Sequence, residues 1–240
     1  MNDLKISQKC KNILKNFSQG LQDIYHDELL SIVLYGSAAS GEFVDKHSNL
    51  NLVVVLRNTD LEILEKASKL IHRYKMLNVL FMTKDYIASS TDVFPVEFLD
   101  MQDNYFVIHG EDILKDIHVD VRNLRFQCEQ ELKGKLVKLK QMYLAAYGNE
   151  RALERLLFMS FTSILHILRN VLRLKGKKPP YLKQDVIKEI ASELKIDNES
   201  WQKILAVKNK QIRLNKQEIL KLFLVFARDL EKIVNITDRL

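Results

Sequence analysis

The chain has 240 residues, of which 47% are hydrophobic and 28% charged, a composition that excludes an intrinsically disordered protein. The formal net charge of +6 is compatible with an anionic partner such as a nucleotide, but it does not identify one. Two distant cysteines, Cys10 and Cys128, match no metal-ligand spacing, and no apolar run of about 18 residues predicts a membrane span. We therefore expect a cytoplasmic protein with reduced thiols.

The first half of the chain alternates between helical and strand patterns. Apolar residues at helical spacing predict two helices, over 4–25 and 60–74. Short apolar runs predict four strands, over 29–35, 50–56, 77–82 and 95–101. Pro95 stands at the start of the fourth run, where a strand tolerates proline. These elements predict a first domain of strands and helices over residues 1–117.

From about residue 118 onward the sequence shows helical periodicity only. The predicted helices cover 121–143, 150–175, 183–195, 199–208 and 215–236. The segment 150–175 is apolar on nearly all sides, so we expect other helices to surround it. Helices that follow one another through short connections predict a helical bundle as a second domain, over residues 118–240.

The stretch from Gly36 to Asn51 carries the functional argument. A strand runs into Gly36-Ser37, where glycine lets the backbone approach a ligand and a following helix start offers N–H groups to phosphate. The next strand presents Asn49 and Asn51 on one face, because side chains alternate with period two. Gly36, Ser37, Asn49 and Asn51 are therefore the candidates for contacts with a phosphate-bearing ligand such as a nucleotide; the alternative for the two asparagines is that they only hydrogen-bond neighbouring loops.

This segment resembles the signature of the DNA polymerase β-like nucleotidyltransferase superfamily. The signature consists of a Gly-Ser turn, a second glycine and a Ser-Asp-x-Asp-apolar strand; the matching residues are Gly36, Ser37, Gly41, Ser48, Leu50 and Leu52. The superfamily includes aminoglycoside nucleotidyltransferases and the minimal nucleotidyltransferases of toxin–antitoxin pairs. The resemblance implies an α+β fold, with a mixed sheet and flanking helices followed by an all-α bundle. It also implies a substrate cleft between the two domains.

The departures from that signature concern the metal site. In active relatives two aspartates hold two Mg²⁺ ions that bridge the phosphates of a nucleoside triphosphate, and both positions are asparagine here, Asn49 and Asn51. A third acid usually follows on a later strand, and the candidates are Glu97 and Asp100, on opposite faces of the predicted strand. Glu97 is the preferred catalytic or metal-binding candidate, and the alternative is an ordinary edge or surface acid. Asp45 is an alternative metal ligand or an ordinary solvated residue.

In the helical half, Arg169 and Arg173 lie one turn apart on the apolar helix. They are candidates for contacts with phosphate, although such residues also pair with acids or reach the surface. Two groups of basic residues, 133–140 and 203–216, predict solvated faces, and without interleaved aromatic residues they argue weakly for nucleic acid. Nucleic acid and self-association into a homo-oligomer remain open.

Three hypotheses follow. The first is a nucleotidyltransferase-fold protein, inactive or weakened, that binds a nucleotide in the cleft between the domains. The second is an active transferase with a rebuilt Mg²⁺ site that uses Glu97, Asp100 or Asp45. The third is a protein-interaction module, which exposed apolar side chains on a helical face would favour.

Overall fold

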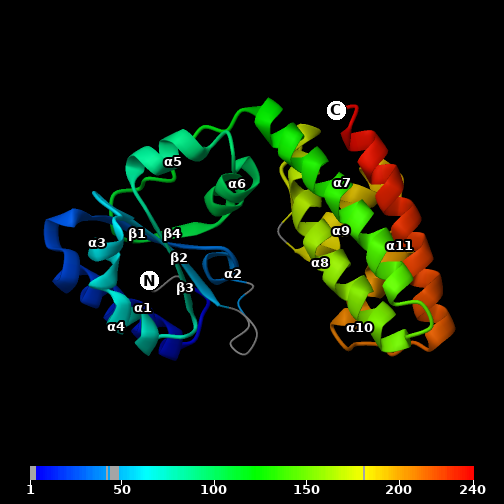
Figure 1. Cartoon of the computed structure of the whole chain (residues 1–240), viewed down its shortest axis with the longest axis horizontal. Helices are drawn as coiled ribbons and strands as arrows, with labels where there is room; N and C mark the ends of the chain where they lie inside the picture. The colour runs from blue at the N-terminus through cyan, green and yellow to red at the C-terminus, as the bar shows by residue number, and fades with distance from the viewer. Residues whose placement is uncertain (1–3, 42, 44–48, 181) are drawn as a thin grey trace. The chain divides into compact units, whose positions relative to one another are not determined.

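The computed structural model describes residues 4–41, 43, 49–180 and 182–240. Contacts divide the chain into two compact units, Met1–Asp120 and Val121–Leu240, whose helices and strands are drawn in Figure 1. The first unit has a mixed four-stranded sheet with helices on both faces, and the described part of the second unit contains helices and their connections. The expected fold class, a mixed sheet with flanking helices followed by a helical region, is confirmed.

The sheet has the strand order β3-β2-β1-β4. Its strands are β1 (Leu29–Tyr35), β2 (Leu50–Leu56), β3 (Leu77–Met82) and β4 (Tyr105–Gly110). β1 pairs antiparallel with β2 and with β4, whereas β2 and β3 are parallel. β1 and β2 occupy the centre and are covered on both faces, which explains their nearly continuous apolar sequences. The first three predicted strands are confirmed.

One face of the sheet is covered by three helices. They are α1 (Gln8–Tyr25), α3 (Leu61–Glu65) and α4 (Ser68–Arg73), and the 3-10 turn η1 (His26–Glu28) joins α1 to β1. Leu14, Phe17 and Leu21 of α1 are fully buried in a core with alternate residues of β1 and β2. The helical character predicted over 60–74 is confirmed, but it is divided into two short helices separated by Lys66 and Ala67.

The other face is covered by α5 (Lys84–Ser90) and α6 (Pro95–Asp103), whose Ile87, Phe98 and Met101 pack against Val53 of β2. The prediction of a strand over 95–101 was therefore wrong. Proline is tolerated at the start of a strand, but it is also favoured in the first turn of a helix, where its missing N–H is not needed. The spacing of the buried Phe98 and Met101 is the helical one.

The helical unit consists of α7 (Val121–Ala145), α8 (Glu150–Leu174), α9 (Lys183–Leu194), α10 (Asn198–Lys208) and α11 (Lys216–Thr237). α8 packs against all four of the others. Among the described residues it is the one helix whose length and hydropathy would suffice to cross a membrane, but 56% of that window is buried inside the protein. Its apolar character is thus that of a central bundle helix.

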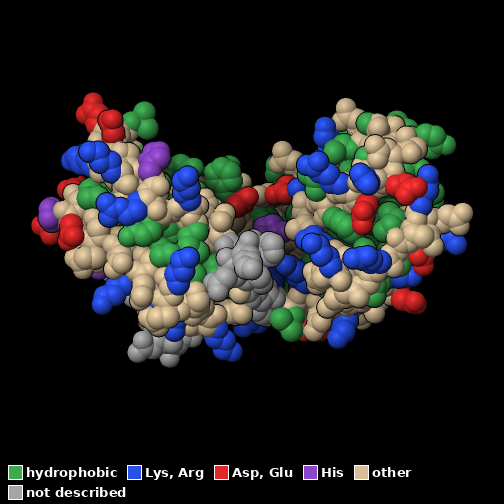
Figure 2. All heavy atoms as spheres, turned by 90° about the horizontal axis from the view of Figure 1, so that it is seen from below, with side chains coloured by type: hydrophobic (Ala, Val, Ile, Leu, Met, Phe, Trp, Pro, Cys, Tyr) green, Lys and Arg blue, Asp and Glu red, His purple; other side chains and the backbone are tan. Residues whose placement is uncertain are grey.

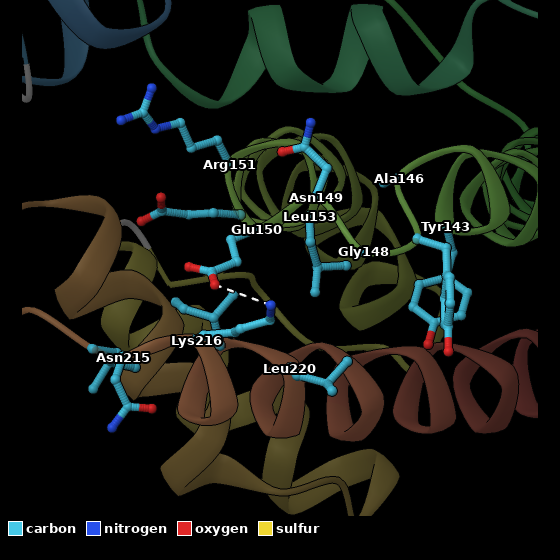
Figure 3. A pocket seen from close by; sticks show the side chains of 14 residues that line it. Tyr143, Ala146, Gly148, Asn149, Glu150, Arg151, Leu153, Asn215, Lys216 and Leu220 are labelled. Atoms are coloured by element: carbon cyan, nitrogen blue, oxygen red, sulfur yellow. Dashed lines mark ion pairs between the residues drawn. The ribbon is translucent and has the colours of Figure 1, made fainter.

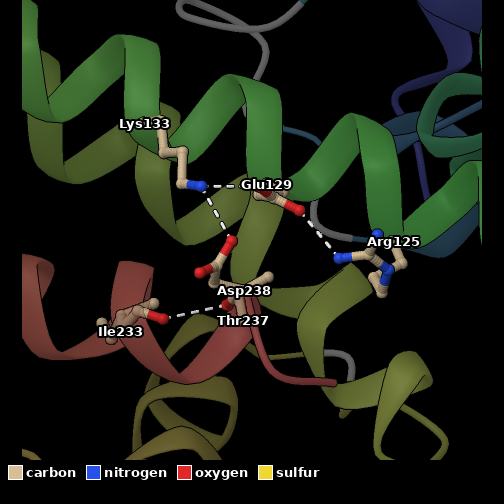
Figure 4. Close-up of polar contacts among 6 residues, drawn as sticks. All are labelled: Arg125, Glu129, Lys133, Ile233, Thr237 and Asp238. Atoms are coloured by element: carbon tan, nitrogen blue, oxygen red, sulfur yellow. Dashed lines mark hydrogen bonds and ion pairs between the residues drawn. The ribbon is translucent and has the colours of Figure 1, made fainter.

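Polar contacts connect α7 to the end of α11 (Figure 4). Lys133 of α7 donates to Asp238 at 2.8 Å and to Glu129 at 2.6 Å. The hydrogen bonds to Asp238 and Glu129 raise the pKa of the Lys133 ammonium, and Lys133 lowers the pKa of Asp238. All three side chains reach solvent, so these contacts contribute little to the stability of the fold.

Candidate functional site

The Gly36 turn lies at the end of β1. Gly36 adopts φ 76° and ψ −145°, a conformation that side chains other than hydrogen rarely allow. Its N–H donates to the carbonyl of Asn104 at 3.1 Å, which ties the turn to the segment before β4. Its carbonyl accepts from Ala39 and Ser40, and the four-residue helix α2 (Ser37–Ser40) begins there. The expected helix start is therefore present, but it is a single turn.

Asn51 lies directly beside this turn. A Cβ atom placed on Gly36 would be 3.3 Å from Asn51 Nδ2, so the amide group of Asn51 fills the space that a side chain at 36 would need. Asn51 Oδ1 accepts a hydrogen bond from Asn78 Nδ2 at 3.2 Å. Asn49 precedes β2 and is exposed. The structure thus brings Gly36 and Asn51 together, and it leaves Asn49 at the surface near the start of the same strand.

The register of the sheet extends this site into a polar row across all four strands. Asn78 of β3 pairs with Asn51 of β2, Asn51 with Tyr35 of β1, and Tyr35 with Tyr105 of β4. Directly paired residues share a face, and both tyrosines pack on the face covered by α5 and α6. Burial raises the pKa of the Tyr35 hydroxyl, so Tyr35 is a neutral group near neutral pH.

Three members of this row were not predicted from the sequence, namely Asn78, Tyr35 and Tyr105. Tyr105 donates to Asp112 Oδ2 at 3.0 Å, and burial followed by this contact raises the pKa of its hydroxyl. β4 itself was missed, although the aromatic and β-branched run over 105–108 and the following Gly110 are signals of a strand and its end.

The acidic candidates do not form the predicted strand. Glu97 and Asp100 belong to α6, where residues three apart lie on one side of a helix, whereas the predicted strand placed them on opposite faces. Glu97 is exposed and Asp100 is half-buried. α6 covers the sheet face that carries Asn51, because Phe98 and Met101 pack against Val53, two residues along β2. Asp45 lies outside the described residues.

The donor set does not fit a pair of Mg²⁺ ions. Magnesium prefers carboxylate and phosphate oxygens, but Asn49 and Asn51 carry neutral amides. The amide oxygen of Asn51 is already bonded to Asn78. Among the described residues, no group of three or more His, Cys, Asp or Glu side chains is placed to hold a metal ion. The described residues therefore offer polar, uncharged contacts beside a backbone turn.

The basic candidates lie in the helical unit. Arg173 of α8 hydrogen-bonds to Oδ1 of the fully buried Asn170, and Arg169 is half-buried one turn earlier. Lys133, Lys135 and Lys140 all form ion pairs with acids. On the face drawn in Figure 2, Lys and Arg side chains are interspersed with hydrophobic and acidic ones in both units. Such a surface is typical of solvated faces more than of a nucleic-acid site.

Comparisons with known proteins add evidence on the fold. No protein-family model matches the sequence, and no curated protein sequence matches it. Among solved structures, the chain is similar to spectinomycin adenyltransferase AAD(9) from Enterococcus faecialis with ATP and spectinomycin. The TM-score is 0.59 at 10% identity, over 92% of this chain and 99% of that one. The chain has a nucleotidyltransferase-type fold. At 10% identity the similarity concerns the fold alone. It confirms the nucleotidyltransferase-type fold that we expected from the Gly36–Asn51 segment.

Proposed function

We propose that this protein binds a nucleotide at the Gly36 turn without a pair of metal ions, and that nucleotidyl transfer is lost or much weakened. The observation that carries the proposal is the placement of Asn51. Its amide group lies against Gly36, where the family signature has a metal-binding aspartate. The similar adenyltransferase structure contains ATP, which makes a nucleotide the natural ligand class to test.

The chemistry of the turn supports an acceptor-rich ligand. The N–H groups of Ser37 and Ala38 make no hydrogen bond to another described residue, and Ser37 adds a hydroxyl. Asn51 and Asn78 have amide groups that can donate and accept. Phosphate and sugar oxygens, which accept hydrogen bonds, suit these groups without a metal ion between them.

The absence of negative charge on Asn49 and Asn51 explains why two-metal catalysis is not expected. One pair of unit charges about 4 Å apart is worth roughly 4 kcal/mol at an effective dielectric constant near 20. Replacing two carboxylates by the neutral Asn49 and Asn51 removes several such interactions with a divalent pair. Glu97 or Asp100 on α6 would be the substitute ligand if transfer survives, and Glu97 is exposed.

The experiment is a thermal-shift titration of ATP, GTP, CTP and UTP, each in Mg²⁺ and in EDTA. A ligand at 100 times its Kd stabilises the folded state by about 2.7 kcal/mol. We expect a shift that persists in EDTA for the wild-type chain. In the double variant Asn49→Asp and Asn51→Asp, the shift should become larger with Mg²⁺ than with EDTA.

The control for this double variant is Asn12→Asp, which adds a carboxylate on the exposed side of α1. It should behave like the wild type in Mg²⁺ and in EDTA. Two results would overturn the proposal: no shift with any of the four nucleotides, or robust Mg²⁺-dependent transfer of a nucleotide by the wild-type chain. The second result would revive the active transferase with a rebuilt metal site.

A second candidate function is self-association through α7. Phe126, Val137 and Leu144 are 63%, 69% and 73% exposed. Separations of 11 and 7 residues return to nearly the same side of a helix, so these three side chains lie on one side of α7, with Lys133 between Phe126 and Val137. Exposed apolar side chains on one side of a helix favour contact with another chain, and a second copy of this chain is the partner we test.

Sedimentation velocity over a range of protein concentrations tests this candidate. We expect a concentration-dependent dimer that Val137→Lys abolishes. The control Met159→Lys changes a side chain of α8 that is 56% exposed, and it should leave the dimer intact. A wild-type chain that stays monomeric at every concentration would remove the candidate.

A further inference from the structure

The helical unit contains a pocket at the end of the bundle where α7 ends and where α8 and α11 begin (Figure 3). Its volume is about 370 Å³, which lies within the roughly 300–1,000 Å³ of typical ligand sites. All the residues that line it fall within 143–154 and 214–220. The pocket is therefore separate from the Gly36 turn and independent of the function proposed for that turn.

Aromatic and aliphatic side chains make most of its wall. Tyr143 lies in the last turn of α7 and Tyr147 in the turn that follows it, and Leu153 and Leu220 come from α8 and α11. The ring of Tyr143 is stacked on Phe223 with ring centres 5.1 Å apart, so its position is fixed by the core of the bundle. Tyr147 is 81% exposed and stands at the rim.

Four of the described residues that line the pocket are charged, and only two of them form an ion pair with each other. Glu150 and Lys216 form an ion pair at 3.1 Å, which is drawn in Figure 3. Arg151 is exposed, and its side chain extends away from Tyr143 and Leu220. Glu154 lines the pocket and is half-buried, and its carboxylate makes no hydrogen bond or ion pair with another described residue.

We propose that this pocket binds a small organic cation, an amine carried on an aromatic or aliphatic body. The Glu154 carboxylate would accept a charge-assisted hydrogen bond from the ammonium group. The faces of Tyr143 and Tyr147 attract cations through their ring quadrupoles. The apolar wall would cover the body of the ligand, as in most small-molecule sites.

The test uses the full chain and three probes that share a phenyl ring and differ in the head group: phenethylamine, 2-phenylethanol and 3-phenylpropionate. Calorimetry gives the Kd, and the amide signal of Gly148 in a ¹⁵N–¹H spectrum places the probe, because Gly148 lines the pocket. We expect the amine to bind at least about fivefold more tightly than the alcohol, since hydrogen bonds to charged groups are the stronger ones. The carboxylate should bind most weakly.

Glu154→Gln removes the charge while keeping the size of the side chain. We expect it to abolish the preference for the amine and to leave the Kd of the alcohol unchanged. The control Glu199→Gln removes an exposed carboxylate from α10 and should leave the preference intact. Equal binding of the amine and the alcohol to the wild type, an unchanged preference in Glu154→Gln, or a Gly148 signal that none of the three probes shifts would overturn the proposal.

Discussion

Gly36→Ala tests whether the turn beside Asn51 has the conformation described above. At φ 76° and ψ −145°, an alanine would occupy a strained region of backbone space, which costs of order 1–3 kcal/mol. Its Cβ would also lie 3.3 Å from Asn51 Nδ2, so the amide would have to move by a few tenths of an ångström. We expect the free energy of unfolding of the first unit to fall by about 1–3 kcal/mol.

The assay must separate the two units of the chain. Trp201, the only tryptophan, is buried in the helical unit, so its fluorescence reports unfolding of that unit. Hydrogen exchange of peptides from β1 and β2 reports the stability of the sheet. Gly36→Ala should speed exchange in these strands and leave the Trp201 transition unchanged. It should also weaken binding of ATP, because Asn51 is displaced.

Gly134→Ala is the matched control. Gly134 lies inside α7, and a Cβ atom there would meet no other atom within 4 Å. Alanine in a helix interior is more favourable than glycine by roughly 0.5–1 kcal/mol, so this variant should be slightly stabilised. If Gly36→Ala exchanges as slowly as the wild type in β1 and β2, the turn does not require glycine, and the placement of Asn51 against it is wrong.

Three further predictions concern other parts of the chain. In Gly110→Ala the new Cβ would lie 2.0 Å from the carbonyl oxygen of Leu30, so hydrogen exchange in the sheet should be faster than in Gly36→Ala. A rate equal to that of the wild type would contradict this contact. Asp229 accepts from Trp201 Nε1 at 2.9 Å, so Asp229→Ala leaves a buried donor unsatisfied and should cost about 1–3 kcal/mol by Trp201 fluorescence in urea, while Asp229→Asn should cost less. Burial raises the pKa of the Tyr35 hydroxyl, so its contribution to the free energy of unfolding is complete below the unfolded pKa of about 10 and is lost as pH rises further. Tyr35→Phe should therefore flatten the fall in the free energy of unfolding between about pH 9 and 11. If this free energy falls equally steeply with pH in the variant and the wild type, Tyr35 is not the source of the fall.

The parts of the fold that local patterns determine were predictable from the sequence. β1 and β2 are buried on both faces and have nearly unbroken apolar sequences. The stretch 95–101 was misassigned because a short apolar run with proline at its start fits the beginning of a strand and of a helix equally well. β4 is a half-buried edge strand, and it was missed although its run of aromatic and β-branched residues over 105–108 is a strand signal.

The site was predictable to the extent that it depends on alternation within one strand. Period two placed Asn51 on a defined face of β2, and the packing of Val53 and Val55 identifies this face as the one under α5 and α6. The partners of Asn51 depend instead on strand register. Asn78 and Tyr35 are brought beside it by pairings between distant segments, which no local pattern in the sequence encodes.

The placement of Asn51 also bears on the proposed function, in which an amide stands where the superfamily signature has an aspartate. A carboxylate at this position could only accept hydrogen bonds, and beside a nucleotide it would need a cation to balance its charge. An amide accepts from Asn78 through its oxygen and presents its nitrogen, a donor, to the Gly36 turn. Under the proposed function, Asn51 would therefore supply a donor that needs no metal ion where the superfamily signature has an acceptor that needs one. A phosphate or sugar oxygen at the turn would meet N–H groups from both the backbone and Asn51, and for this reason binding without Mg²⁺ is the outcome that separates this site from that of a metal-dependent transferase.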